Sequence, residues 1–226
     1  MFNEANFSKL AEFIYRKSGI FLEVSKHYDK INKFVLNRMD ELDQDSFRKY
    51  FFKLRFEDAE GKEFQELMNA VTVNETYFFR EKDQFEALVN FILPELDNIM
   101  PKNKPLRILS SPCSTGEEPY SMILHIVEEG KIVENRDIEV VGIDIDSTVI
   151  EKAKKAKYTE HSVHAVPKDI LAKYFKKKNI GYELDEDLQG RVDFQVVNVF
   201  DKIQMKNLGK FGINNIVRIF FKLNYN

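Results

Sequence analysis

The sequence has 226 residues, of which 43% are hydrophobic and 31% charged, so the chain can bury the core of one large domain or two small ones. A net charge of −3 argues against a general nucleic-acid binder, and a single cysteine excludes an internal disulfide and argues against a cysteine-ligated zinc site. No apolar run approaches the roughly 20 residues that cross a membrane, and no signal peptide precedes Phe7, so we expect a cytoplasmic protein.

The first part of the chain, residues 6–70, is predicted to be helical. Apolar residues from Phe7 to Tyr15 recur at helical spacing, and this helix is predicted to end at Ser18-Gly19. Further apolar helical patterns cover residues 25–42, 47–56 and 64–71. Their phenylalanines are assigned to the core and not to a cofactor.

The helix at 25–42 carries a basic stripe, in which Lys26, Lys30 and Lys33 fall on the side opposite the apolar positions. Between residues 16 and 38, six basic residues stand against two acidic ones, although the chain as a whole is acidic. A solvated helix face would explain this stripe. A surface that attracts an acidic partner would explain it as well.

A polar turn, N-E-T at 74–76, precedes three aromatic residues at 77–79 and then Arg80. A capped helix start in which Arg80 pairs with Glu81 or Asp83 would account for the pattern. The residues that follow, up to position 100, are predicted to form a linking helix.

Residues 106–121 are predicted to form a strand, a tight loop and a helix. An apolar run bounded by prolines gives the strand, and Glu117 opens the helical pattern. The loop between them consists of small residues, so a ligand can approach its backbone at the start of the helix. Because Glu117 and Glu118 would repel a phosphate, the loop suits a positively charged ligand better than a dinucleotide. S-adenosylmethionine is such a ligand.

A second strand is predicted at 138–143 and a third at 191–197, followed by Asn198. An acid at the carboxyl end of the second strand is where doubly wound folds bind ribose hydroxyls. We assign this role to Asp144, and the N-cap of the following helix to Asp146.

The segment from 158 to 190 is polar and rich in lysine. A helix is predicted from Pro167 onward, with the lysines at 176–178 as its solvated end. His161 and His164 are three residues apart, but no further Cys or His lies near them. They are assigned to a loop or the core and not to a metal.

Three motifs occur in order along the chain: N-E-T-Y-F-F-R at 74–80, C-S-T-G-E-E-P-Y-S at 113–121 and G-I-D-I-D at 142–146. Together they resemble the CheR family, the chemotaxis-receptor glutamate methyltransferases, over residues 7–211. The resemblance implies S-adenosyl-L-methionine as cofactor and S-adenosyl-L-homocysteine as product. It also implies the cytoplasmic helices of methyl-accepting chemotaxis receptors as partner, with the basic stripe facing their acidic methylation helices.

The resemblance implies roles for single residues. Arg80 is the implied catalytic residue, since its guanidinium could hold the substrate carboxylate in a bidentate grip. Glu118, or Glu117, would meet the positive amino-acid end of the cofactor. Asn198 would read the adenine edge, with a turn residue as the alternative. The implied cofactor-binding set is Asn74, Thr76, Arg80, Glu118, Asp144, Asn198 and Val199, and no metal site is implied.

The predicted fold class is α/β, with an all-helical domain at 1–80 and a Rossmann-like S-adenosylmethionine-dependent methyltransferase domain at 81–226. A fourth strand is expected within 213–221. Because the motif that ends the family's next strand is not identifiable beyond Phe211, we expect a truncated or frame-altered C-terminus and an incomplete sheet with an apolar edge open to association.

Two functions remain open at this point. One is methyl transfer to receptor glutamates by a protein that would be monomeric if complete and would reach the membrane only through its receptor. The alternative is a catalytically impaired remnant that binds receptor or cofactor, because turnover would need residues that relatives supply beyond Phe211.

Overall fold

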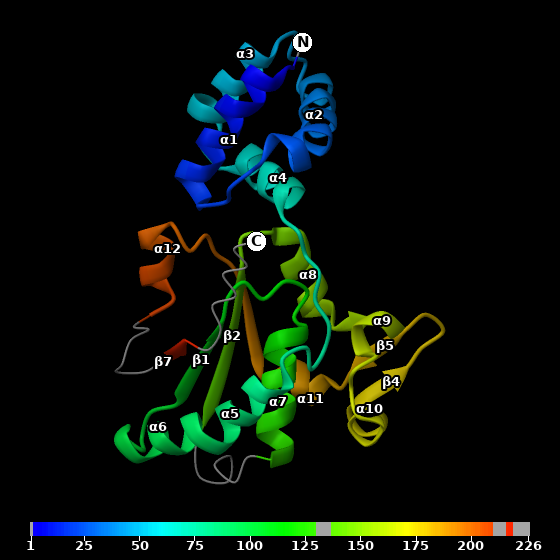
Figure 1. Ribbon diagram of the computed structural model, residues 1–226. Coiled ribbons are helices and arrows are strands. Elements are labelled where there is room, and N and C mark those ends of the chain that lie inside the picture. The colour runs from blue at the N-terminus through cyan, green and yellow to red at the C-terminus, as the bar shows by residue number, and fades with distance from the viewer. Residues whose placement is uncertain (1, 130–136, 210–215, 219–226) are drawn as a thin grey trace. The chain divides into compact units, whose positions relative to one another are not determined.

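The structure, a computed structural model, describes residues 2–129, 137–209 and 216–218, and of 216–218 the backbone only. The chain divides into two compact units (Figure 1). The helical unit comprises Met1–Val73 and Asn198–Met205, and the sheet unit comprises Asn74–Val197 and Lys206–Asn226. The whole N-E-T-Y-F-F-R motif therefore belongs to the sheet unit, and a short later segment returns to the helical one.

The helical unit contains α1 (Glu4–Ser18), α2 (Val24–Glu41), α3 (Phe47–Phe52), the π-helix η1 (Lys53–Glu57) and α4 (Lys62–Val71). The predicted end of the first helix is confirmed: Gly19 takes the left-handed conformation with φ 74°, and its N–H donates to the carbonyl of Tyr15 at 2.8 Å. The core of this unit is apolar and includes Phe7, Leu10, Ile14, Ile31, Val35, Tyr50 and Leu67.

A charged pair lies at the edge of this core. Arg38, counted above among the basic residues, donates from Nε to both carboxylate oxygens of Glu63, at 3.1 and 3.2 Å. The hydroxyl of Tyr50 donates to the same carboxylate at 2.9 Å. Because Glu63 is only 6% exposed, this pair ties α2 to α4 and removes Arg38 from the basic surface. The hydrogen bond to Glu63 raises the pKa of Arg38.

The sheet unit begins with a continuous helical stretch and then alternates strands and helices. The helical stretch consists of α5 (Lys82–Ala87), η2 (Leu88–Ile92) and α6 (Leu93–Ile99). The main sheet contains β1 (Leu106–Ser110), β2 (Ile138–Asp144), β6 (Val192–Val196) and β7 (Ile216–Arg218), and the helices that accompany it are α7 (Glu117–Glu129), α8 (Ser147–Lys155) and α11 (Glu186–Gln189). The helix α12 (Lys202–Asn207) spans the boundary of the two units. The strand order is β6-β2-β1-β7, and every pair is parallel. The predicted strands are confirmed, and the sheet is the parallel one of a doubly wound fold.

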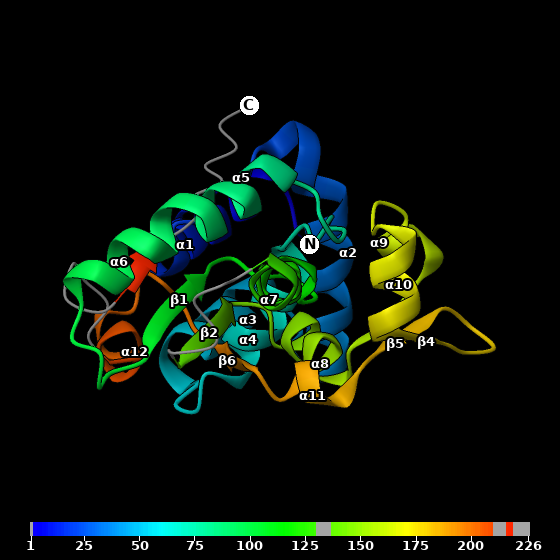
Figure 2. The ribbon, with the colours of Figure 1, turned by 90° about the horizontal axis from the view of Figure 1, so that it is seen from below.

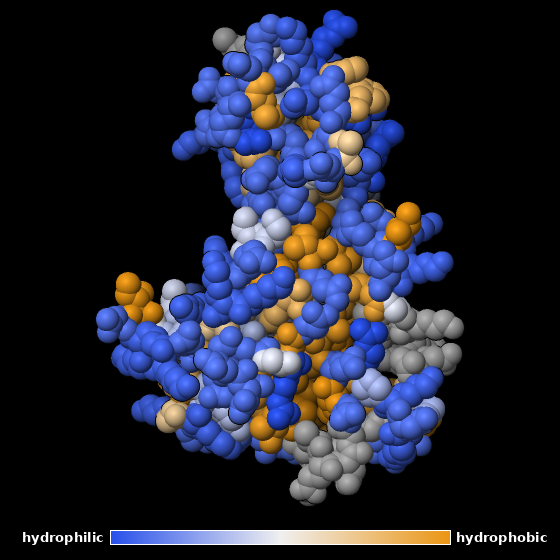
Figure 3. Space-filling model, turned by 180° about the vertical axis from the view of Figure 1, so that it is seen from behind, coloured by the Kyte–Doolittle hydropathy of each residue, from blue (hydrophilic) through white to orange (hydrophobic). Residues whose placement is uncertain are grey.

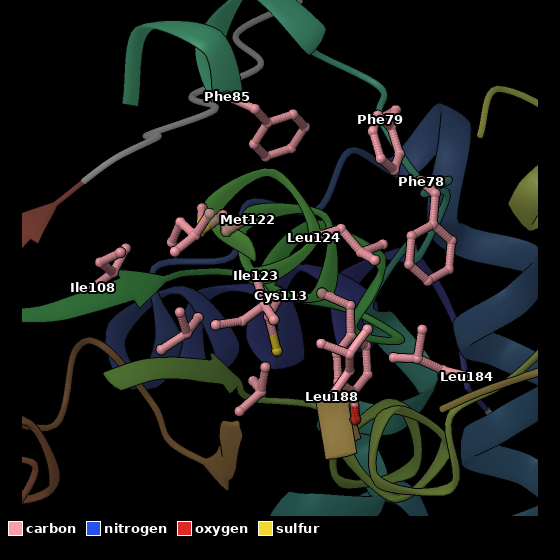
Figure 4. Packing of buried hydrophobic residues seen from close by; sticks show 14 of the residues in the cluster. Phe78, Phe79, Phe85, Ile108, Cys113, Met122, Ile123, Leu124, Leu184 and Leu188 are labelled. Atoms are coloured by element: carbon pink, nitrogen blue, oxygen red, sulfur yellow. The ribbon is translucent and has the colours of Figure 1, made fainter. Parts of the chain in front are cut away.

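The core of the sheet unit lies between the sheet, α7 and α8, and α5 packs on α7 from outside (Figure 2). In Figure 4, Phe79 and Phe85 lie above α7 and Leu188 lies below it. Gly142, in the middle of β2, has a packing reason to be glycine. A Cβ there would lie 2.8 Å from the ring of Phe194 and 3.2 Å from the sulfur of Cys113.

A second, antiparallel sheet lies in the lysine-rich segment at 158–190, for which only a helix from Pro167 was predicted. Its order is β3-β5-β4, with β3 (Lys157–Tyr158), β4 (Phe175–Lys177) and β5 (Tyr182–Leu184), accompanied by α9 (Glu160–Val163) and α10 (Lys168–Tyr174). The assignment of the lysine tract to a helix end was wrong, because α10 stops at Tyr174 and Lys176 and Lys177 pair with β5. Strands of two or three residues are too short to show a period in the sequence.

The surface of the described residues is mixed. No helix in the described ranges is both long enough and apolar enough to cross a bilayer. Seen from behind, hydrophobic residues form a patch that is bordered by hydrophilic residues on the sheet unit (Figure 3). Val196, on the edge strand β6, is 41% exposed.

Candidate functional site

The candidate site lies where β1 and β2 end. The two strands are parallel and in register up to Ser110 and Gly142, so the loop after β1 and the acid that ends β2 lie at the same edge of the sheet. Ligands of open α/β sheets bind at this edge, outside the carboxyl ends of the strands.

The loop between β1 and α7 is held in a tight conformation. The N–H of Cys113 donates to the carbonyl of Ile143 at 2.9 Å, which ties the loop to β2. Ser114 and Gly116 both take positive φ, 47° and 92°. A Cβ at Gly116 would lie 2.9 Å from that of Ala153, so both its backbone and its packing require glycine. The predicted helix start at Glu117 is confirmed.

The two glutamates that begin α7 have different environments. Glu117 is 2% exposed and accepts a hydrogen bond from Thr115 Oγ1 at 2.6 Å. Burial raises its pKa, and the Thr115 hydrogen bond opposes that rise. Glu118 is half-buried and accepts from Ser110 Oγ at 2.6 Å. Of the two, Glu118 is therefore the one that a ligand in solution can reach.

Asp144 is a buried carboxylate, 4% exposed, and backbone N–H groups donate to both of its oxygens. Its Oδ2 accepts from the N–H of Ser114 at 2.9 Å, and its Oδ1 from the N–H of Asp146 at 3.0 Å. Burial raises the pKa of Asp144, and hydrogen bonds from the backbone N–H groups of Asp146, Ser114 and Ile145 oppose that rise. Each carboxylate oxygen can accept more than one hydrogen bond, so acceptor capacity remains for ligand hydroxyls.

Asp146 caps α8, as predicted. Its Oδ1 accepts from the N–H groups of Thr148 and Val149, at 2.8 and 3.3 Å. Its other oxygen accepts from Nδ2 of Asn74 at 2.9 Å. This contact, which the sequence analysis did not foresee, connects the start of the N-E-T-Y-F-F-R motif to the end of β2.

The rest of that motif presents Arg80 at the surface. Thr76 and Tyr77 are half-buried, the two phenylalanines are buried, and Arg80 is exposed. Its guanidinium donates to the carbonyl of Glu75 at 3.0 Å and lies over the ring of Tyr77 at 5.7 Å. Among the described residues, no carboxylate lies within ion-pair distance of this guanidinium, which suits a group that receives a substrate carboxylate.

Asn198 and Val199 belong to the returning segment of the helical unit. The side chain of Asn198 donates to the carbonyl of Lys17 at 2.8 Å and accepts from the N–H of Phe200 at 3.0 Å. Val199 is 45% exposed. Their assignment to the adenine edge stays a prediction.

The carboxylates of the site fit a ligand that carries both hydroxyl groups and a positive charge. Asp144 offers an acceptor to hydroxyls, and Glu118, in the first turn of α7, offers a negative charge beside the end of β1. In the ranges that the structure describes, no group of three or more His, Cys, Asp or Glu could hold a metal ion. The sequence analysis missed Ser110 and Ser114 as supports of these carboxylates, although Ser110 directly precedes the small-residue loop and Ser114 lies in it.

The basic stripe on α2 is a separate candidate surface. Lys26, Lys30 and Lys33 are all exposed. Lys26 pairs with Glu23 at 2.8 Å, and Lys30 donates to the carbonyl of Thr72 at 3.3 Å. The opposite side of the helix is buried, as predicted, through Ile31, Val35 and Met39.

Known proteins are similar to this chain over most of its length. Residues 74–222 match the family model described as CheR methyltransferase, SAM binding domain, so the match runs past residue 211, where the resemblance was judged to end. The chain is 39% identical over 211 residues to "Chemotaxis protein methyltransferase 2" of Vibrio cholerae, covering 93% of this chain and 72% of that relative. It is 30% identical to "Chemotaxis protein methyltransferase" of Campylobacter jejuni, covering 93% and 74%, and 28% identical to that of Salmonella typhimurium, covering 88% and 67%. The chain belongs to the CheR methyltransferase family, whose domain binds S-adenosylmethionine.

Proposed function

We propose that the protein transfers a methyl group from S-adenosylmethionine to glutamate side chains on the cytoplasmic helices of chemotaxis receptors. The observation that carries this proposal is a pair of carboxylates at one edge of the sheet, Asp144 at the end of β2 and Glu118 in the first turn of α7, beside a loop that is tied to the motif of Arg80. The names of the relatives support the receptor as substrate.

The residues of the site then have separate tasks. Asp144 accepts hydrogen bonds from the ribose hydroxyls, and Glu118 attracts the ammonium group of the cofactor. Asn74 and Thr76, at the start of the N-E-T-Y-F-F-R motif, line the cofactor-binding site. Arg80 holds the carboxylate of the incoming substrate glutamate. The bound cofactor supplies a methyl group on a positively charged sulfur.

No general base is required in this scheme. A glutamate side chain is already ionised at neutral pH, so its oxygen is a competent nucleophile. The protein accelerates transfer by aligning that oxygen with the methyl group and by excluding water from it. Arg80 is the group that fixes the carboxylate, so the rate should depend on its geometry and not only on its charge.

The stripe of Lys26, Lys30 and Lys33 supplies the complementary surface. A receptor bundle rich in glutamate would be steered to three exposed ammonium groups, mainly through a faster association rate. Because the methylation helices of such receptors lie in the cytoplasm, the proposal includes a cytoplasmic location for this protein.

Two measurements test the proposal. Calorimetric titration with S-adenosylhomocysteine tests the cofactor half, and transfer of labelled methyl to receptor-containing membranes tests the reaction. Arg80→Ala is the blank and Arg80→Lys the matched control, because lysine keeps the charge but cannot grip a carboxylate with two donors. We expect cofactor binding in all three proteins and transfer only in wild type. Equal transfer by wild type and Arg80→Ala would remove Arg80 from the reaction.

A further inference from the structure

Arg80 follows a residue with an unusual backbone. Phe79 has φ 62°, in the left-handed region that residues other than glycine rarely adopt. Such a conformation persists only where the surroundings hold it, and it is found most often at functional sites. The contacts of Phe79 therefore show what determines the direction in which the chain presents Arg80.

The main chain of this turn is held from two sides. The N–H of Phe78 donates to the carbonyl of Ser162 at 2.9 Å. The N–H of Phe79 donates to Oγ of Ser121 at 3.0 Å, and that hydroxyl donates in turn to the carbonyl of Glu117 at 2.6 Å. Ser121 is completely buried. Because its hydroxyl both donates and accepts, its orientation is fixed, and with it the position of the Phe79 amide.

The side chain of Phe79 is held by the same helix. His125, one turn after Ser121 on α7 and 2% exposed, has its ring centroid 4.5 Å from that of Phe79 and 4.9 Å from that of Phe85. Its Nδ1 lies 2.8 Å from the carbonyl of Ser121. Figure 4 shows the rings of Phe79 and Phe85 on the same side of α7. One face of α7 thus contacts both the backbone and the ring of Phe79.

We propose that Ser121 and His125 are positioning residues for Arg80, which set the turn at Phe79 and thereby the place of the guanidinium. The inference rests on the function proposed above for Arg80. Neither residue touches the substrate. Both act through Phe79. The helix α7 begins at the loop where the cofactor is proposed to bind, and its residues Ser121 and His125 contact Phe79, so this one helix connects the cofactor-binding loop to the turn that carries Arg80.

The first test uses Ser121→Ala in the full chain. Loss of the hydroxyl leaves the buried Phe79 amide without its acceptor, and the better helix propensity of alanine offsets this only in part, so the melting temperature should fall by a few degrees and both proteins are assayed well below it. The amide of Phe79 should exchange with solvent roughly tenfold faster, and methyl transfer to receptor membranes should slow by roughly tenfold, as expected for one lost hydrogen bond. The affinity for S-adenosylhomocysteine should stay within about twofold, because the loop and Asp144 keep their contacts.

The chain offers a matched control in Ser18, another buried helical serine. Its Oγ donates to the carbonyl of Ile14 at 2.8 Å and accepts from the N–H of Ile20 at 3.3 Å, the same pattern as at Ser121. Ser18→Ala should leave the exchange of the Phe79 amide and the transfer rate as in wild type. A second pair separates ring packing from hydrogen bonding: His125→Phe should keep most of the transfer rate, and His125→Ala should lose roughly tenfold or more.

Two results would overturn the proposal. One is unchanged Phe79 exchange in Ser121→Ala. The other is faster exchange with an unchanged transfer rate, since the turn would then not matter to the reaction. Failure of the proposed function would look different, because wild type itself would transfer no methyl, while the exchange of Phe79 would still decide whether Ser121 holds the turn.

Discussion

Replacing Asp144 by alanine should weaken both cofactor binding and the fold, by amounts that the contacts of this side chain allow us to separate. Its Oδ1 accepts from the N–H of Asp146, which is 1% exposed, so removing the acceptor leaves that donor without a partner at a cost of about 1–3 kcal/mol of unfolding free energy. Loss of the acceptor of the Ser114 N–H lowers the unfolding free energy less, because water can reach this half-buried residue and replace the hydrogen bond.

The binding loss is a separate quantity. Ribose hydroxyls would lose a charged acceptor, which is worth about 1.5–3 kcal/mol, and the dissociation constant of S-adenosylhomocysteine should rise about 10- to 150-fold. Asp144→Asn is the matched variant, because it keeps the size and one acceptor oxygen but loses the charge, and it should fall between the other two. Titration calorimetry, at a temperature where circular dichroism shows all three proteins folded, measures the difference.

The pH dependence of binding gives an independent check. Burial raises the pKa of Asp144 above its ordinary value of 3.8. The carboxylate therefore gains its proton at a higher pH than an exposed aspartate, and affinity for S-adenosylhomocysteine should fall as the pH drops through that raised pKa. A folded Asp144→Ala protein that binds with the affinity of wild type would refute the assignment.

Three other predictions concern stability and the receptor surface. Glu63→Ala should lower the unfolding free energy by about 1–3 kcal/mol, because Tyr50 and Arg38 lose a buried acceptor while Arg38 keeps its contact with Glu41; urea titration measures this, and Glu63→Gln, which keeps one acceptor oxygen, should lose less. Reversing Lys26, Lys30 and Lys33 to glutamate should slow association with a glutamate-rich receptor fragment at low salt and leave calorimetric cofactor affinity unchanged, and insensitivity to both charge and salt would reduce the stripe to a solvated face. Burial lowers the pKa of His125 below its ordinary value of 6.5; the Ser121 carbonyl, Glu129 and Glu86 oppose this shift, and Lys82 adds to it. The unfolded chain therefore takes up the proton at a higher pH than the folded one, stability should fall as the pH drops below 6.5, and the melting temperature of His125→Phe should fall less over the same range.

Much of the fold could be predicted from local patterns. The apolar runs of β1, β2 and β6 are long enough to show a period, and Gly19 and Glu117 mark helix ends by their own chemistry. The short strands β3, β4 and β5 could not be found in this way, since two or three residues give no period and their pairing depends on partners far along the chain.

The acidic residues of the candidate site could be predicted from the sequence, but the residues that hydrogen-bond to them could not. Asp144 and Asp146 stand at the end of an apolar run, and their division into a buried acceptor and a helix cap follows from that position. That Asn74 bonds to Asp146 depends on a fold that brings together residues 72 apart in the sequence. Arg38 is the counterpart: its charge was read as surface charge, because only the folded chain brings Glu63 to it.

The contacts of residues 198–200 with α1 have a consequence for how the protein is made. Asn198 bonds to the carbonyl of Lys17, 181 residues earlier in the chain, and the ring of Phe200 packs against Gly19, where a Cβ would lie 2.1 Å from it. At about 5–20 residues per second, a ribosome would deliver that ring about 10–40 s after the end of α1. During this interval the C-terminal end of α1 lacks both contacts, so we expect a fragment that ends at Val73 to be less stable at this end of α1 than the full chain.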